Sequence, residues 1–485
     1  MKKLIYKIAV LALVTGGLTS CDSELDQIPF DEFANESAYI SVNDFENAAR
    51  GIYATLVKGS LYGGSDNGGM LDAPDILSDN VTFAQKGRGT RRTLHNWQYG
   101  ATDQPMGSLY ERAYQMIYRA NLLLANSVNF EGTNKEKVVA EAKALRALGH
   151  LDLVTFFGKI PTQSGDANGS LGIAYVTEPD PLALPVRETV GAVYDKIVQD
   201  LLEARADIPL TNDEGRFTKE SVNLLLSRVY LYMGGPDNWT KAVAAANNVT
   251  TPVGKRNKIV GVWEDTSKDG VLFNIPFAES TPLDFSIGVT WSQFGVTTLV
   301  PEYVVSYPLY NLFAADDIRK DAYTFQASNG SGTSKLEFNA IKKLFAKGGN
   351  GKPGLVDIKL FRVAEARLNK AEAQYNLGQE PQALITLNSV RDERYLSYTG
   401  GESGTALRDA IRLERRLEFA FESQRFFDLK RWGESIDRGG FGDLADGSGT
   451  PSDAQSLPAS SPKFQLPIPQ TAMDLNPNMV QNPGY

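Results

Sequence analysis

The chain has 485 residues with a formal net charge of −9, and 42% of its residues are hydrophobic and 10% aromatic. The acidic balance argues against nucleic acids and other polyanions as partners and leaves neutral ligands open, while the apolar content is enough to bury a large core. Cys21 is the only cysteine, so disulfide bonds and thiolate metal sites are excluded.

Residues 1–20 have the pattern of a lipoprotein signal peptide. Lysines at positions 2, 3 and 7 precede an apolar stretch, residues 8–14, that is far shorter than the roughly 20 residues of a membrane-spanning helix. Removal of this segment takes the three lysines with it and leaves a net charge of −12. No later apolar run is long enough for a second membrane segment.

Cys21 is the predicted lipid attachment site. The four residues that end in it, Leu-Thr-Ser-Cys, resemble the bacterial lipobox, in which the thiol receives diacylglycerol and cleavage leaves the cysteine as the first residue. A lone thiol in an exported chain needs a reason, and more than one acyl chain anchors a protein stably. The alternative is an ordinary signal peptide with an incidental thiol. We predict that residues 21–35 form a lipidated acidic tether and that residues 36–485 form a single domain.

Helical patterns recur along this domain. Apolar residues at helical spacing, with turn residues between the runs, predict helices at residues 108–128, 136–157, 189–209, 218–233, 239–249, 358–377 and 382–391. Thr189 can cap the third of these helices and Pro209 stops it. Two of the hairpins share a Leu-rich helix, a tyrosine, a glycine turn and an Ala-containing second helix, which resembles irregularly spaced tetratricopeptide repeats.

Residues 254–334 have a different composition. Short β-like runs such as residues 271–276 alternate there with glycine, proline and many aromatic residues. We therefore predict a mainly α fold, in which tetratricopeptide-like helical hairpins form a scaffold and long loop-rich insertions carry little β structure.

Motifs for catalysis are absent from the sequence. His95 and His150 lie far apart, and His150 falls within a helical pattern, where a packed or capping role is expected. There is no HExxH, no GxSxG and no usable phosphate loop, since a proline interrupts residues 349–353. Residues 443–453 lack the spacing of a calcium loop. We predict no enzyme activity, no metal site and no cofactor; calcium bound through loop carboxylates is left open but not shown.

Three glutamates, Glu414, Glu418 and Glu422, are spaced four residues apart, so their carboxylates line one face of a helix. Glycoside hydrolysis needs two carboxylates opposed across a cleft. The helix is apolar on most faces, which indicates a buried position where charges must be paired. A structural ion network is therefore predicted in preference to a catalytic pair.

Two C-terminal stretches resemble a known family. Residues 412–433 (RLERRLEFAFESQRFFDLKRWG) and 464–485 (FQLPIPQTAMDLNPNMVQNPGY) look like the closing signatures of the RagB/SusD family, whose members are surface lipoproteins of Bacteroidota that capture nutrients, mostly glycans. Further segments match in the same order along the chain, at residues 26–29, 50–53, 118–121, 143–147, 157–161, 371–373 and 388–391. One departure is Ser423, where the family often has glycine.

The resemblance implies a lipoprotein on the outer face of the outer membrane that binds glycans or oligosaccharides. It also implies a partner, a SusC-like TonB-dependent transporter, because a lipid-anchored surface protein cannot import a ligand by itself. The same scaffold capturing peptides or another nutrient is the first alternative. A tetratricopeptide-like assembly scaffold without a ligand pocket is the second, and a surface glycosidase comes last.

A neutral glycan site needs aromatic platforms beside amide and carboxylate hydrogen-bonding groups. Trp97 and Trp291 lie in polar or glycine-containing segments, and the resemblance implies that binding surfaces draw on these two regions. We predict that both rings stack on the ligand, with Tyr62, Asp79 and Asn80 nearby. For each residue, a core or turn role remains an equal alternative.

Overall fold

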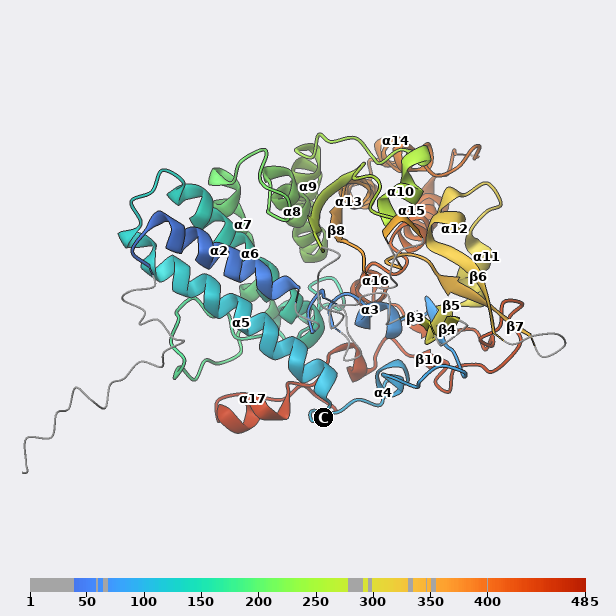
Figure 1. Ribbon diagram of the computed structural model, residues 1–485, viewed down its shortest axis with the longest axis horizontal. Helices are drawn as coiled ribbons and strands as arrows, with labels where there is room; N and C mark the ends of the chain where they lie inside the picture. Colours follow the sequence, from blue (N-terminus) through green and yellow to red (C-terminus); the bar gives the residue numbers. More distant parts are fainter. Residues whose placement is uncertain are drawn as a thin grey trace, which may run out of the picture.

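The computed structural model describes residues 39–57, 60–63, 69–277, 291–294, 299–329, 335–345, 347–349, 355–398 and 400–485. The predicted signal peptide, Cys21 and the tether lie outside these residues. Most of the long helices lie in one half of the molecule; the other half contains the strand pairs, the loops and the short helices, together with the 15-residue helix Gly404–Glu418 (Figure 1). None of the described helices has the length and the apolar character needed to cross a membrane.

The helical half is a series of helices packed on one another. Each helix contacts the next in the series, and α13 also contacts α8 and α9. The series consists of α2 (Val42–Leu56), α5 (Gln104–Asn126), α6 (Lys135–Phe157), α7 (Val190–Asp207), α8 (Lys219–Met233), α9 (Pro236–Asn247), α13 (Val363–Asn376) and α14 (Glu380–Arg391). The predicted mainly α scaffold of helical hairpins is confirmed.

Local sequence signals set the ends of these helices. The Thr189 hydroxyl accepts a hydrogen bond from the Ala192 N–H and caps α7, as predicted. Ser41 caps α2 in a capping box, because its hydroxyl accepts from the Asp44 N–H and the Asp44 carboxylate accepts from the Ser41 N–H. Pro236 occupies the first turn of α9, so that helix begins three residues before the predicted start.

One predicted helix is wrong in its first part. Residues 358–362 form β8 (Ile358–Arg362), which pairs antiparallel with β2 (Val271–Ile275), and helix α13 begins only at Val363. The Val363 N–H donates to the carbonyl of Gly270, so the strand pair leads directly into the helix. The partner strand lies about 90 residues away in sequence, and helical periodicity does not detect such a pairing.

The other half contains the predicted loop-rich insertions with little β structure. Its strands form separate antiparallel pairs: β1 (Val81–Phe83) with β5 (Tyr303–Val305), β3 (Ser292–Phe294) with β4 (Leu299–Pro301), β6 (Thr324–Asn329) with β7 (Leu336–Ile341), and β9 (Ile436–Asp437) with β10 (Ser456–Leu457). Its helices are α3 (Ala73–Ile76), α4 (Arg92–His95), α10 (Ile259–Trp263), α11 (Tyr307–Leu312), α12 (Ile318–Tyr323), α15 (Gly404–Glu418), α16 (Arg425–Trp432) and α17 (Gln470–Leu475).

Candidate functional site

Trp97 and Trp291 are buried. Their predicted role in ligand binding depended on exposure to water, and the prediction that they are exposed is wrong. Trp97 is 6% exposed and Trp291 is 1% exposed. The Trp97 indole N–H donates to the Leu77 carbonyl at 2.9 Å, and the Arg438 guanidinium lies over its ring at 4.0 Å. Trp291 packs edge-on against Phe421. Stacking of a ligand on these two rings stays a prediction that no contact in the structure supports.

Asp79 and Asn80 are also buried, and their polar groups are used internally. Arg425 and Arg416 contact the Asp79 carboxylate at 2.8 and 3.1 Å. Burial by itself raises the pKa of Asp79, but the two arginines outweigh burial and hold this pKa below its ordinary value. The Asn80 amide donates to Asp75 at 2.9 Å and its oxygen accepts from Arg416 at 3.2 Å.

The predicted residues nevertheless lie around one feature, residues 71–80, which we call the 71–80 segment. This segment contains α3 and rests against the C-terminal signature. Its carboxylates and carbonyls accept hydrogen bonds from residues 421, 423, 425, 416 and 438. The residues predicted for ligand binding thus lie at a meeting point of distant parts of the chain, which is packed in the interior.

Ser423 has a structural explanation at this meeting point. Its φ is +64°, in the left-handed region where glycine is normally preferred. The Ser423 N–H donates to Asp75 at 3.0 Å, and its hydroxyl donates to the Leu71 carbonyl at 2.6 Å. The hydroxyl contact offsets the backbone strain, so serine is accommodated where the family often has glycine.

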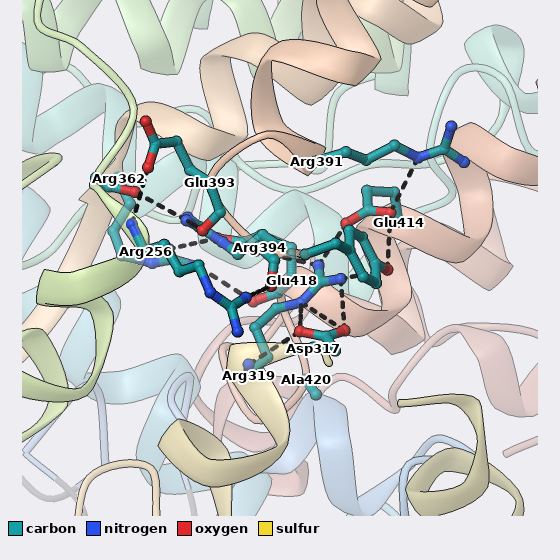
Figure 2. A network of polar contacts seen from close by, with 12 residues as sticks. Arg256, Asp317, Arg319, Arg362, Arg391, Glu393, Arg394, Glu414, Glu418 and Ala420 are labelled. Carbon is teal, nitrogen blue, oxygen red and sulfur yellow. Dashed lines mark hydrogen bonds and ion pairs between the residues drawn. The ribbon is translucent and has the colours of Figure 1, made fainter. Parts of the chain in front are cut away.

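The three glutamates of the C-terminal signature form the predicted ion network. Glu418 is fully buried and accepts from Arg362 at 2.7 Å and from Arg394 at 2.8 Å (Figure 2). Glu414 pairs with Arg319 at 2.6 Å, and Glu422 pairs with Arg362 at 2.5 Å. Burial raises the pKa of Glu418, yet the surrounding arginines hold it well below its ordinary value. Every one of these carboxylates is bound to a cation inside the protein.

Tyr62 is buried and lines a small cavity. Its hydroxyl donates to Asp152 Oδ2 at 2.8 Å, while Asp152 Oδ1 has no hydrogen-bond partner among the described residues. The cavity has a volume of about 30 Å³ and is also lined by Arg228 and Ser423. Burial raises the pKa of Asp152 to about 7, because the charged form is poorly solvated there.

Asp152 gives a testable dependence of stability on pH. Between pH ~4 and ~7 the Asp152 carboxyl is protonated in the folded state and ionised in the unfolded chain. The stability that this proton contributes is therefore fully present below pH ~4 and is lost as the pH rises through ~7. We expect Asp152→Asn to gain stability relative to the wild type by up to about 1.4 kcal/mol per pH unit in this window.

Urea titrations of both proteins at pH 5, 6, 7 and 8 measure this difference. Burial also raises the pKa of Asp75, to about 6, and lowers that of His150, to about 3. Both groups remain in the variant, so their effects cancel in the comparison. A difference that stays constant with pH would contradict the raised pKa of Asp152.

A surface groove lies at the loop-rich end of the molecule, between α11, the β6–β7 hairpin and the loop at residues 443–448. Its volume is about 450 Å³. We call it the α11–β7 groove; its lining residues are Tyr310, Gln326, Lys335, Leu336, Glu337, Asn339, Leu444, Ala445 and Asp446. It combines an aromatic ring with amides, carboxylates and an ammonium group, which is the mixture that a sugar ring with apolar faces and hydroxyl edges requires.

Hydrogen bonds fix the side chains of the α11–β7 groove in place. The Gln326 amide donates to the Tyr310 hydroxyl at 3.0 Å and to Asn339 Oδ1 at 2.7 Å. The Asn339 amide in turn donates to the Ala445 carbonyl at 3.1 Å. The ammonium group of Lys320 lies 4.4 Å from the centre of the Tyr310 ring. Such a preformed arrangement reduces the entropy lost when a ligand binds.

The acidic wall of the groove is held in the same way. Asp446 accepts from the Ser448 hydroxyl at 2.6 Å and from the Ser448 N–H at 3.0 Å. The side-chain hydrogen bond is the main reason that the pKa of Asp446 lies below its ordinary value. Across the groove, exposed Glu337 pairs with exposed Lys335 at 2.9 Å. The groove therefore presents hydrogen-bonding groups with little net charge.

The two histidines are internal and fill structural roles. The Val176 N–H donates to His150 Nε2 at 3.0 Å, so the Nδ1–H donates to the Arg146 carbonyl at 2.9 Å. His95 lies between the Ile76 carbonyl and the Ser452 hydroxyl. Within the described part of the chain, no three or more His, Cys, Asp or Glu side chains are arranged to hold a metal ion.

The chain matches two family models. The SusD family model matches residues 340–485, and a model described as "Starch-binding associating with outer membrane" matches residues 42–231. This chain belongs to the SusD/RagB family. The resemblance carried by the C-terminal signatures is thereby confirmed, and SusD/RagB proteins are binding proteins and not enzymes, so the predicted lack of catalytic activity agrees with the family.

Individual relatives align over almost the whole chain. The SusD-like protein P2 of Formosa agariphila is 24% identical over the full length of both chains. The starch-binding protein SusD of Bacteroides thetaiotaomicron is 23% identical, and the alignment covers 100% of this chain and 99% of that protein.

Solved structures show the same SusD fold. A SusD superfamily protein from Bacteroides thetaiotaomicron superimposes with a TM-score of 0.80 at 25% identity, over 92% of this chain and 100% of that protein. A putative sugar-binding protein from Bacteroides vulgatus superimposes with a TM-score of 0.79 at 23% identity, over 93% of this chain and 100% of that protein.

The α11–β7 groove was not among the residues predicted from sequence. Tyr310 and Gln326 lie within the predicted loop-rich region 254–334, but Asp446 comes from a distant loop. The signal available in the sequence was limited to the coincidence of aromatic and amide residues in a loop-rich region. The sequence contains no local pattern that predicts the approach of these three separate segments.

Proposed function

We propose that this protein is a lipoprotein of the cell surface that binds oligosaccharides and delivers them to a TonB-dependent outer-membrane transporter of the SusC type. The match of residues 42–231 to a family described as starch-binding and associated with the outer membrane carries the proposal. Two proteins that align over 100% and 93% of this chain are named as a starch-binding protein and a putative sugar-binding protein, which supports the same ligand class.

The chemistry of the α11–β7 groove is compatible with such a ligand. One face of a sugar ring can pack on Tyr310, while its hydroxyl groups can bond to Gln326 and Asp446. Lys335 and Glu337 neutralise each other at the rim, which suits a neutral ligand better than an anionic one. We therefore propose the groove as the place where the oligosaccharide binds.

Binding is tested with the purified chain of residues 22–485 on a glycan array, followed by calorimetric titration. We expect binding of neutral oligosaccharides, and we expect Tyr310→Ala to weaken it by roughly 1–3 kcal/mol, by analogy with the stacking of bases on aromatic side chains. The melting temperature should change little, because Tyr310 is only half-buried.

Tyr118→Ala is the matched control. Tyr118 is also half-buried, but it lies on α5 in the helical half of the molecule (Figure 1). Unchanged affinity of Tyr310→Ala for a bound glycan would place the site elsewhere. Binding of peptides and of no glycan at all would overturn the proposed ligand class and favour the peptide-capturing alternative.

The lipid anchor is a separate part of the proposal. We expect Cys21→Ala to yield an uncleaved or released soluble protein with its fold unchanged, because the acyl chains alone hold the wild type to the membrane. Membrane fractionation with a circular dichroism spectrum of the released protein measures both properties. A variant that stays with washed membranes would reveal another anchor. Purification of the lipidated wild type from membranes should bring the transporter with it.

A further inference from the structure

The loop between α15 and α16 contains two residues with an unusual backbone conformation. We call residues 419–424 the 419–424 loop. Phe421 has a φ of +65° and Ser423 has a φ of +64°, both in the left-handed region where residues other than glycine are strained. For a bulky residue such as phenylalanine this conformation is rare. Such strain persists only where the surrounding structure holds the backbone in place.

The Asp75 carboxylate holds the N–H groups of both strained residues. The Phe421 N–H donates to Oδ1 at 3.1 Å, and the Ser423 N–H donates to Oδ2 at 3.0 Å. The Asn80 amide also donates to Oδ1. Among the described residues, Oδ1 therefore has two donors and Oδ2 has one. Asp75 is fully buried, so both hydrogen bonds to the loop are shielded from water.

Lys343 holds the carbonyl groups of the same region. This lysine follows strand β7 and is fully buried. Its ammonium group donates to the Ala420 carbonyl at 2.8 Å and to the Glu418 carbonyl at 3.2 Å. It also pairs with the Glu422 carboxylate at 2.6 Å. The loop is thus fixed by one buried cation, which binds its carbonyl groups, and by one buried anion, which binds its N–H groups.

We propose that the 419–424 loop is a latch, which the ionised carboxylate of Asp75 keeps closed and which loosens when this carboxylate takes up a proton. The proton goes to Oδ2, the oxygen with a single donor, and a protonated carboxyl oxygen is a donor. The Ser423 N–H then loses its acceptor, whereas the Phe421 N–H keeps Oδ1. The backbone strain at Ser423 favours opening of the loop once that hydrogen bond is lost.

The charged groups around the latch respond differently to pH. Burial raises the pKa of Asp75 to about 6, although hydrogen bonds from Asn80 and the loop and the charge of Lys343 act in the opposite direction. Asp79 stays ionised, because its two arginine partners outweigh burial and hold its pKa below the ordinary value. Burial lowers the pKa of Lys343 to about 7. Asp152, whose pKa burial raises to about 7, lines the same cavity as Ser423.

Uptake of a proton by Asp75 loosens the latch without destabilising the fold. The pKa of this carboxyl is higher in the folded state, about 6, than in the unfolded chain, about 4. The stability linked to the proton is therefore fully present below pH ~4 and is lost as the pH rises through ~6. The expected response to acid is a local opening of the loop in a protein that remains folded.

Residue-resolved hydrogen exchange at pH 5, 6, 7 and 8, corrected for the intrinsic effect of pH on exchange, tests the latch. We expect the protection of the Ser423 N–H to be at least about tenfold lower at pH 5 than at pH 8, as for the loss of one hydrogen bond to a charged group. Protection of the Phe421 N–H should change less. In Asp75→Asn only one acceptor oxygen remains, so the Ser423 N–H should exchange fast at every pH.

Ser423→Gly is the matched control, because it removes the strain and the hydroxyl but keeps Asp75 and the N–H of residue 423. Its exchange should still depend on pH, with a midpoint near pH 6. Loss of that dependence would assign the response to the serine hydroxyl and overturn the role of Asp75. Lys343 and Asp152 remain in both variants, so a pH dependence of Asp75→Asn equal to that of the wild type would also overturn the latch.

The wild type alone keeps the latch testable. Circular dichroism at each pH shows whether each protein is folded. Protection of the wild-type Ser423 N–H that is the same from pH 5 to pH 8 would overturn the latch, even if Asp75→Asn does not fold. A fall in protection with a midpoint near pH 6, in a protein that stays folded, is the expected result.

Discussion

Replacing Glu418 by glutamine should lower the free energy of unfolding by about 3–5 kcal/mol, the range found when one partner of a buried ion pair is removed. Glu418 is fully buried, and its two oxygens accept hydrogen bonds from Arg362 and Arg394 and also from Arg319 at 3.3 Å. Glutamine has nearly the same shape but no charge, so these buried guanidinium groups lose a shared counter-ion. Guanidinium chloride denaturation, followed by circular dichroism, measures the change.

Asp409→Asn provides the control for this prediction. Asp409 lies on the same helix, α15, and pairs with Arg408, but both side chains are largely exposed to water. An exposed pair of this kind contributes little to stability, so the denaturation midpoint of the control should match that of the wild type. A midpoint for Glu418→Gln within error of the wild type would show that the network does not depend on its central carboxylate.

Replacing Trp97 by alanine should lower the free energy of unfolding by about 3–5 kcal/mol, the usual range for a large aromatic residue truncated in a core. The structure gives the reason, since the indole is buried, bonded to the Leu77 carbonyl and covered by Arg438. The variant would leave a cavity and a buried carbonyl without its donor. Thermal melting and calorimetric titration of the bound oligosaccharide should be carried out on the same preparation.

The combination of the two measurements separates the possible roles of Trp97. A large fall in melting temperature with retained affinity assigns the residue to the core, which is the expected result. Unchanged melting with lost binding would instead restore its predicted role as a stacking platform. Trp97→Phe is a useful companion variant, because it keeps an aromatic ring under Arg438 and removes only the indole donor.

The helices were predictable because their signals are local. Apolar periodicity and the capping residue Thr189 lie within the helices that they define, so residues 136–157 and 218–233 were predicted to within one residue at each end. Strand β8 was not predictable in the same way, because its partner β2 is separated from it by most of the loop-rich region. Strand pairing over such a distance leaves no periodic signal in either segment.

In the candidate site, too, features with a local sequence signal were predictable and features that depend on distant segments were not. Composition and loop position suggested that Trp97 and Trp291 would be exposed, but exposure depends on which distant segments cover a side chain. The Arg438 that covers Trp97 is more than 300 residues away in sequence. In contrast, the pairing of Glu414 and Glu418 was predictable, because apolar neighbours on most faces of a helix already require that its charges be buried with partners.

The 71–80 segment also bears on how the chain reaches its folded state. Its carboxylates, Asp75 and Asp79, bond to residues 421–425, and about 346 positions separate the partners in sequence. A chain made from its N-terminus therefore completes this segment long before the groups that satisfy it exist. Contacts between residues so far apart in sequence form slowly. Until they form, the 71–80 segment exposes apolar and charged groups, which favours misfolding and aggregation. We infer that the last step of folding requires the C-terminal sixty or so residues. A chain without these residues would form its N-terminal helices but could not complete the packing of its core.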